Sequence, residues 1–379
     1  MPLPESSAAL RDPAAADLAA CRRLLRAGSK SFYAASLLLP AAIRHPACAL
    51  YAFCRLADDA VDIDSGGLAA VEQLRLRLDA VYAGTPHEIP ADRALAVVVV
   101  RHGIPRTLLD ALLEGFVWDS TARRYDSLAD LQAYAARVAG TVGAMMALLM
   151  GVREPSAIAR ACDLGVAMQF TNIARDVGED ARNGRVYLPA DWLRDAGLAP
   201  EDLLANPRFD APLAGVIERL LAEADQLYAR VDSGLVRLPA ACRPGINAAR
   251  LLYAEIGHEL RRRGGDSISQ RAVVPGSRKL GLLMQAYAAD LDPAAGADVP
   301  AIPAVQFLID AVARTPAPPP DVAAQIAQTS PPWWQFRARA LWVIDLFERL
   351  ERSERERMAE RHRNSSWPPM TTGLQASES

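Results

Sequence analysis

Two stretches of the sequence carry acidic side chains at a spacing that suits metal binding. Asp58 and Asp62 lie four residues apart, and so do Asp176 and Asp180. On a helix, residues four apart share one face, and like charges there destabilise the helix by about 0.2–0.5 kcal/mol. That cost favours a partner of opposite charge. Because no His or Cys accompanies these carboxylates as a ligand pair, the oxygen-only donor set favours Mg²⁺.

An arginine accompanies each acidic pair, and its planar guanidinium suits the oxygens of a phosphate. Arg55 precedes the first pair, and Arg175 is adjacent to Asp176. If the two helices face each other, four carboxylates converge on one space, where two charges about 4 Å apart interact by roughly 4 kcal/mol at an effective dielectric near 20. We therefore predict a site for Mg²⁺ and a diphosphate between two helices. The alternative for each stretch taken alone is a solvated acidic face.

The helices that must position these residues are visible as apolar stripes. In HPACALYAFCRLADDAVDID, a helix is predicted to begin at Pro46, because proline suits a first helical position. In QFTNIARDVGEDARNGRVYLP, residues 169–189, a helix is predicted up to about Asp180. Its apolar face consists of Phe170, Ile173 and Val177, and its polar face of Gln169, Asn172, Asp176 and Asp180.

Helical periodicity dominates the chain from about residue 17 to 290, and alternating strand patterns are scarce. The one β-like run, VVVV at 97–100, lies in a pattern that predicts a helix ending at Gly103. The chain has 379 residues, of which 51% are hydrophobic, so it can bury a large core. These features predict an all-α, single-domain helical bundle.

Charge and cysteine usage exclude several classes of function. The net charge of -3 provides no basic field, so no nucleic-acid partner is expected. The five cysteines are odd in number and form no CxxC pair, which argues against disulfides and structural zinc and fits a reducing cytoplasm. We expect no signal peptide, because the first 17 residues carry acids and lack a long apolar core. The longest apolar run, near 142–150, is shorter than the roughly 20 residues that span a bilayer. We expect a cytoplasmic protein that is at most peripheral to the inner face of the membrane.

The composition divides the chain into four parts. We predict a flexible N-terminus at 1–16, a catalytic domain at 17–290, a C-terminal extension at 291–363 and a disordered tail at 364–379. The extension holds linker-like segments, a short apolar helix at about 304–314, and an amphipathic, charge-rich helix that begins at WWQF. This last helix either packs on the body or contacts a partner or a membrane.

Four stretches resemble the motifs of the squalene/phytoene synthase family, in the family's order. ALYAFCRLADDAVD is similar to its first aspartate-rich motif, and the 169–189 stretch is similar to the second almost residue for residue. GSKSFYAASLLLP, residues 28–40, looks like the segment that closes over substrate. YAEIGHELRRRGGDSISQRAVVPGSRKL, residues 253–280, looks like the C-terminal core helix and the basic segment after it. The resemblance covers about residues 18–290 and is strongest to the bacterial phytoene synthases within the family.

The resemblance implies a class I isoprenoid synthase bundle with a central apolar cavity. It implies that Asp58 and Asp62 bind Mg²⁺ from one wall, and Asn172, Asp176 and Asp180 from the other, with Mn²⁺ as a substitute and no nicotinamide cofactor. Arg55, Arg175 and the aspartates would be catalytic. The residues implied to contact diphosphate or prenyl chain are Ser29, Lys30, Ser31, Tyr51, Arg55, Gln169, Asn172, Arg175, Tyr253 and Arg271.

The implied reaction joins two geranylgeranyl diphosphates head to head, through prephytoene diphosphate, to phytoene, the first committed step of carotenoid synthesis. Peripheral membrane contact, or contact with downstream carotenoid enzymes, would follow from the insoluble product. A squalene or presqualene diphosphate synthase that uses farnesyl diphosphate is the first alternative, and a non-catalytic prenyl-lipid-binding scaffold is the second. The proton acceptor stays open between a cavity tyrosine and released diphosphate, and Tyr187 is interpreted either as packing on its turn or as a lid residue.

Overall fold

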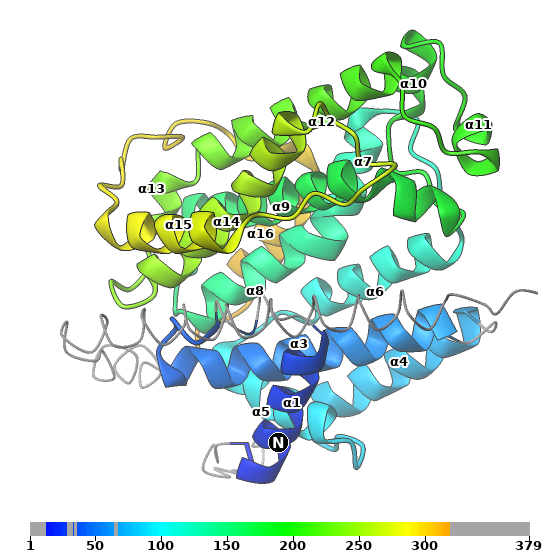
Figure 1. The fold of residues 1–379 in the computed structure, drawn as a ribbon. Coiled ribbons are helices and arrows are strands. Elements are labelled where there is room, and N and C mark those ends of the chain that lie inside the picture. The colour runs from blue at the N-terminus through cyan, green and yellow to red at the C-terminus, as the bar shows by residue number, and fades with distance from the viewer. Residues whose placement is uncertain (1–12, 29–32, 34–35, 64–66, 319–379) are drawn as a thin grey trace, which may run out of the picture.

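The computed structural model describes residues 13–28, 33, 36–63 and 67–318, without the side chains of residues 58, 61–63, 67 and 68. Within these residues every regular element is a helix, which confirms the predicted fold class. The first part of the chain forms α1 (Ala15–Gly28), α3 (Ala41–Ile63), α4 (Gly67–Tyr82), α5 (Pro90–His102) and α6 (Arg106–Ser120). Figure 1 shows α1, α3, α4 and α5 as the lower part of the molecule.

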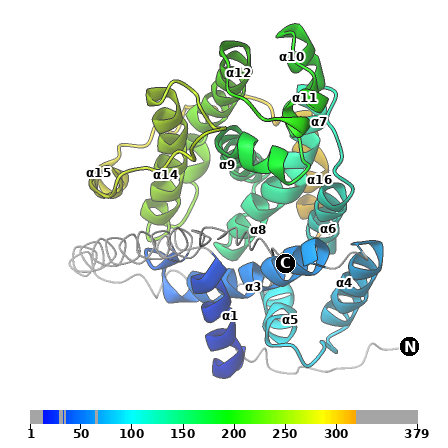
Figure 2. The same ribbon diagram turned by 45° about the vertical axis from the view of Figure 1, so that its right-hand side comes forward.

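The remaining helices build the upper part around α9 (Pro155–Arg182). Before it run α7 (Leu128–Ala135), the π-helical turn η1 (Ala136–Gly140) and α8 (Thr141–Leu149). After it come α10 (Ala190–Asp195), α11 (Pro200–Ala205), α12 (Ala211–Ala229), α13 (Asp232–Leu235), α14 (Arg243–Arg262), α15 (Gly276–Ala288), the 3₁₀ turn η2 (Pro303–Val305) and α16 (Gln306–Arg314). Figure 2 shows α15 on the outer side of α14.

Helix α9 is the centre of the bundle, because it packs against α8, η1, α12, α13 and α14. Most of its first half is buried, as expected of a helix with neighbours on several sides. The backbones come very close at Gly165, where an added Cβ would lie 2.2 Å from the carbonyl oxygen of Ala139. A side chain at this position would therefore push α9 away from η1 and α8.

The helix that carries the first acidic motif begins earlier than predicted. Helix α3 starts at Ala41, so Pro46 lies inside it and the predicted start at Pro46 is wrong. The Pro40 carbonyl accepts hydrogen bonds from the N–H groups of Ile43 and Arg44, so the first turn is already closed upstream. Pro46 removes one helical hydrogen bond, and α3 packs on α1 and α5.

The VVVV run forms a helix, as predicted. Helix α5 ends at His102, and Gly103 adopts a left-handed conformation with φ 56°. Its N–H bonds to the Val100 carbonyl, which closes the last turn. Glycine suits this position because it has no Cβ to clash.

The first part of the C-terminal extension packs on the main bundle. The predicted apolar helix near 304–314 is confirmed as η2 and α16, which bury Val305, Leu308, Ile309 and Val312 in the same core as the other helices. Arg153 donates to the Thr315 carbonyl at 3.0 Å. The predicted boundary near residue 290 stays a prediction. The amphipathic helix from WWQF and the tail at 364–379 lie outside the described residues, and so do residues 1–12.

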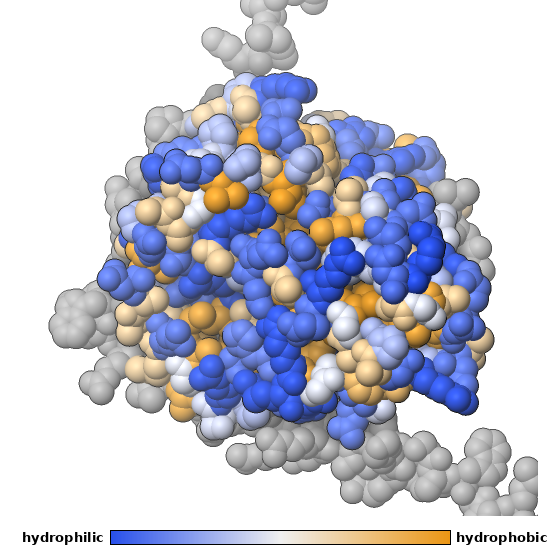
Figure 3. Space-filling view, turned by 90° about the horizontal axis from the view of Figure 1, so that it is seen from above, coloured by the Kyte–Doolittle hydropathy of each residue, from blue (hydrophilic) through white to orange (hydrophobic). Residues whose placement is uncertain are grey.

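No helix among the described residues is long and apolar enough to cross a membrane. The face seen from above in Figure 3 is mainly hydrophilic, and apolar side chains appear on it only in small, separate patches. Scattered apolar residues of this kind are normal on a protein surface.

Candidate functional site

The polar face of α9 is organised around the carboxylate of Asp176. Arg175 donates through Nε to Oδ1 at 2.7 Å and through Nη2 to Oδ2 at 2.5 Å. Arg271 approaches the same carboxylate, with Nη2 3.0 Å from Oδ2 and Nε 2.9 Å from Oδ1. The Arg271 side chain is 53% exposed, whereas Arg175 and Asp176 are 14% and 16% exposed. Two guanidinium groups therefore hold one aspartate, and one of them faces solvent.

A glycine in the second motif explains how Arg271 reaches α9. An added Cβ at Gly178 would lie 2.7 Å from the Cα of Ile268, so a side chain here would displace the segment that follows α14. The Gly178 N–H donates to the Ser267 carbonyl at 3.1 Å. Arg182 donates to the Ile268 carbonyl at 2.6 Å. These contacts dock the segment on α9 and position Arg271 beside the acidic pair.

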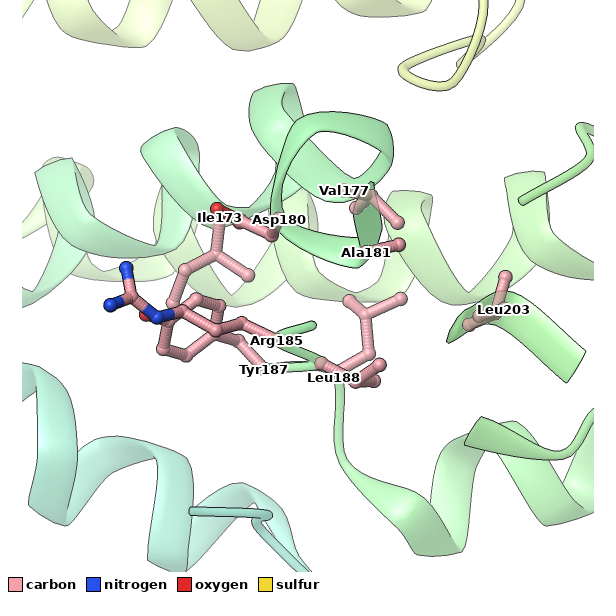
Figure 4. Close-up of a pocket in the computed structure, with 9 residues that line it drawn as sticks. Ile173, Val177, Asp180, Ala181, Arg185, Tyr187, Leu188 and Leu203 are labelled. Carbon is pink, nitrogen blue, oxygen red and sulfur yellow. The ribbon is translucent and has the colours of Figure 1, made fainter. Parts of the chain in front are cut away.

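Asp180, one turn after Asp176, lies in a region of excess negative charge. Its pKa is raised to about 7, first by burial and then by the negative charges of Asp176 and Glu179, while Arg185 acts in the opposite direction. Figure 4 shows Asp180 at a small pocket that α9 forms with Tyr187 and neighbouring residues of its segment. A carboxyl group whose charged form is disfavoured in this way gains stability from a cation placed beside it.

Tyr253 of α14 lies near residues from both aspartate-rich motifs and from the C-terminal motif. Its pKa is raised to about 12, mainly by burial; Arg175 and Arg271 act to lower the pKa, and Tyr51 and Asp176 act to raise it. The charges of these four residues act on one phenol, so all four lie near it. The structure therefore joins Tyr51 of α3 to the α9 face through α14.

On α3, Arg55 pairs with Asp59, with its Nε 3.1 Å from Oδ2. Tyr51 lies against the end of α1, because a Cβ added at Gly28 would be 2.5 Å from the Tyr51 hydroxyl oxygen. Gly28 begins the stretch that resembles the substrate-closing segment. This contact places the start of that stretch beside Tyr51.

Several predicted residues cannot be placed in the site. Ser29, Lys30 and Ser31 lie outside the described residues, and so do the side chains of Asp58 and Asp62. Convergence of four carboxylates therefore stays a prediction. Gln169 and Asn172 lie half-buried on α9.

The carboxylates on α9 can bind a hard divalent cation only together with further oxygen ligands. Among the described residues, no group of three or more His, Cys, Asp and Glu side chains could hold a metal ion. Mg²⁺ usually keeps several waters and is bound through one or two carboxylates together with substrate phosphates. Asp176 and Asp180 supply two such carboxylates, and the charge excess at Asp180 is what a cation would relieve. The residues present therefore fit Mg²⁺ bound jointly with a diphosphate.

Sequence reasoning missed a third acid beside this face. Asp119, at the end of α6, accepts hydrogen bonds from Tyr134 at 2.8 Å and from Tyr187 at 2.7 Å. Its charge also raises the pKa of Asp180, so the two carboxyl groups are near each other. The local sequence GFVWDST looks like an ordinary helix end, and no spacing rule links it to the acidic motifs.

Comparison with known proteins adds to this geometry. The sequence model of the squalene/phytoene synthase family matches residues 25–278, a range that includes α3, α9, α14 and Arg271. The chain belongs to the squalene/phytoene synthase family. Both aspartate-rich motifs of this family member lie inside the matched range.

Similar sequences and structures cover most of this family member. It is 52% identical over 316 residues to a phytoene synthase of Cereibacter sphaeroides, spanning 79% of this chain and 89% of that one. A 15-cis-phytoene synthase of a Paracoccus species is 43% identical over 265 residues, which is 68% of this chain and 86% of that one. The crystal structure of a dehydrosqualene synthase is similar at TM-score 0.67 and 31% identity, covering 72% of this chain and 96% of that one. A squalene synthase from Alicyclobacillus acidocaldarius follows at TM-score 0.62 and 27% identity, covering 66% and 94%.

Proposed function

We propose that this family member is a phytoene synthase that joins two geranylgeranyl diphosphates head to head. The observation that carries the proposal is its 52% identity to a protein named phytoene synthase, over 89% of that protein's length. The geometry supports it, because an acidic face with arginines and a partly exposed guanidinium suits the binding of a diphosphate group.

In the first step, the C1–O bond of one substrate breaks and its electron pair leaves with the diphosphate. The double bond of the second substrate attacks the allylic cation, and loss of a proton closes the cyclopropane ring of prephytoene diphosphate. Arg175 and Arg271 would bind the departing anion, and their contacts with the Asp176 carboxylate support this role. Tyr51 and Tyr253 would line the space next to these arginines.

In the second step, the C–O bond of prephytoene diphosphate breaks, the carbon skeleton rearranges and a proton is lost to give phytoene. The cation would be quenched to an alcohol if water reached it, so the site must exclude water. The apolar faces of α3 and α9 are suited to this role. The central apolar cavity is part of this proposal.

We propose that Mg²⁺, with Mn²⁺ as a substitute, is the cofactor. Bound Mg²⁺ would neutralise the diphosphate and make it a better leaving group. Asp176 and Asp180, with Asn172, would hold it from α9, and Asp58 and Asp62 from α3. No nicotinamide cofactor is expected, because phytoene forms without a reductant.

The test is incubation of the purified protein with MgCl₂ and either geranylgeranyl or farnesyl diphosphate, without reductant. We expect the C40 hydrocarbon phytoene from the first substrate and little product from the second. Absence of a C40 hydrocarbon under these conditions, in the presence of MgCl₂ or MnCl₂, would contradict the proposal.

A second candidate function is the joining of two farnesyl diphosphates. It is favoured by the similarity to solved dehydrosqualene and squalene synthases at 31% and 27% identity. The same incubation separates the two functions, because this candidate predicts a C30 product or presqualene diphosphate from farnesyl diphosphate.

We also propose that the protein acts at the inner membrane surface or beside downstream carotenoid enzymes, since its product is insoluble in water. Flotation of the full chain with anionic vesicles tests the membrane contact. Recovery of all protein in the lipid-free fraction would argue against it.

A further inference from the structure

Asp119 is held in one orientation by two phenol groups. The Tyr134 hydroxyl lies 2.8 and 3.0 Å from its two carboxylate oxygens, and the Tyr187 hydroxyl lies 2.7 Å from Oδ1. Tyr134 is only 3% exposed, whereas Asp119 and Tyr187 are half-buried. The carboxylate therefore sits between a buried donor and a donor at the accessible side.

Tyr187 is itself fixed by its neighbours. Its ring stacks on the Tyr134 ring with centroids 5.1 Å apart, and on the Tyr125 ring with centroids 6.0 Å apart. Its segment is anchored by the N–H of Ala190, which donates to the Tyr125 carbonyl at 2.9 Å. A hydroxyl held in this way can fix the carboxylate that it contacts.

The group borders the proposed active site. Tyr187 lines the same pocket as Asp180, and Figure 4 shows both side chains at that pocket. The charges of Asp119 and Asp180 each act on Tyr187. The proposed reaction passes through carbocations, and a fixed carboxylate together with tyrosine ring faces stabilises positive charge.

We propose that Tyr187 is a positioning residue: its hydroxyl fixes Asp119, so that the carboxylate and the Tyr134 phenol keep one orientation toward the acidic face of α9. This inference rests on the proposed function. Tyr187 is then neither simple packing nor a lid, which are the two interpretations that its sequence context suggests. Because Arg175 and Arg271 contact a different carboxylate, loss of the Tyr187 hydroxyl should slow turnover without weakening substrate binding.

The chain offers a matched control in Tyr125. The Tyr125 hydroxyl is buried without a hydrogen-bond partner among the described residues, while its ring takes part in the same stack. Tyr125→Phe and Tyr187→Phe each remove one oxygen and keep one ring. Only the second removes a hydrogen bond to Asp119.

The experiment measures kcat and KM of the full chain with MgCl₂ and geranylgeranyl diphosphate. We expect Tyr187→Phe to lower kcat about tenfold with KM within about twofold, because a carboxylate that is no longer held in place stabilises the cationic transition state less well. We expect Tyr125→Phe to leave both within about twofold. Equal kcat values for the two variants would overturn the inference. A lower Tm for Tyr187→Phe with unchanged kcat would also overturn it, because it would show a purely structural role.

A double-mutant cycle tests whether Tyr187 acts through Asp119. In an Asp119→Asn background, we expect Tyr187→Phe to change kcat by less than about twofold, because the contact is already altered. A full tenfold effect in that background would overturn the inference. If the wild-type chain makes phytoene but the variants do not behave as expected, the inference about Tyr187 is wrong and the proposed function stands. If the wild type makes no hydrocarbon from either substrate, the proposed function is wrong as well.

Discussion

Helix α9 carries two groups in which one aspartate meets two arginines, and they differ in what surrounds them. At one end, Asp163 is fully buried, and the Nε atoms of Arg160 and Arg230 lie 2.9 and 3.4 Å from its Oδ2. Arg160 also donates to the backbone carbonyls of Gly296 and Val299, the latter at 3.0 Å. Its guanidinium is thus bound to the protein on several sides.

The second group, at the other end of the helix, is open. Asp176 is held by Arg175 and by Arg271, and the Arg271 side chain is 53% exposed. A phosphate can reach this guanidinium, whereas none can reach Arg160, which is 3% exposed. The comparison teaches that residue types alone do not distinguish a structural ion group from a ligand site; the exposure of the arginine does.

The largest expected effect on activity comes from Asp176→Asn in the open group. We expect turnover to fall by at least about a thousandfold, because the substitution removes a charge that would bind the cofactor and orient the arginines. The helical content, measured by circular dichroism, should be unchanged. Turnover near the wild-type rate would remove Asp176 from the proposed machinery.

The same substitution in the buried group around Asp163 should affect stability instead. Asp163→Asn leaves the buried Arg160 and the half-buried Arg230 without this negative partner, and breaking a buried pair costs about 3–5 kcal/mol. We expect a loss of this order in the free energy of unfolding, measured by urea denaturation, with kcat of the folded protein within about threefold of the wild type. The comparison would be broken if Asp163→Asn abolished turnover while leaving stability intact.

Arg271→Ala should weaken substrate binding. We expect KM for the prenyl diphosphate to rise about tenfold, since a charge-assisted contact to phosphate is worth about 1.5–3 kcal/mol. Arg219, equally exposed at 54% but paired with Asp195 elsewhere, is the matched control. Steady-state kinetics of both variants checks this expectation, and an equal KM for the two would contradict it.

The smallest effect concerns the pH dependence of stability. Burial and the nearby negative charges raise the pKa of Asp180 from 3.8 to about 7, so between these values the folded state binds a proton that the unfolded chain has released. The unfolding free energy should therefore fall as pH rises from about 4 to 7, by less than the roughly 4 kcal/mol of the full shift, because Asp180 is only half-buried and solvent screens its charge. Asp180→Asn should flatten this part of the profile in metal-free urea denaturation. An identical pH profile for the variant would contradict the assignment.

Sequence reasoning found what local periodicity encodes. The four-residue spacing placed Asp176 and Asp180 on one face of α9, and the glycine after VVVV marked the end of α5 correctly. The predicted helix start at Pro46 was wrong, because proline suits a first helical turn but this helix already begins after Pro40.

Contacts between residues far apart in the sequence were harder to predict. Arg271 lies 95 residues from Asp176, and only the family resemblance linked it to the site. Asp119 was not found, because its partners Tyr134 and Tyr187 lie on other segments that meet it only in the folded protein. The buried acid Asp163 was also invisible, since helical periodicity gives no sign of its contact with Arg230.

The most direct test of the open group is calorimetric titration of inorganic diphosphate, with and without MgCl₂, into the wild type, Asp176→Asn and Asp163→Asn. The account predicts Mg²⁺-dependent binding to the wild type and to Asp163→Asn, and its loss in Asp176→Asn. Binding to Asp176→Asn as tight as to the wild type would contradict the claim that this end of α9 holds the diphosphate.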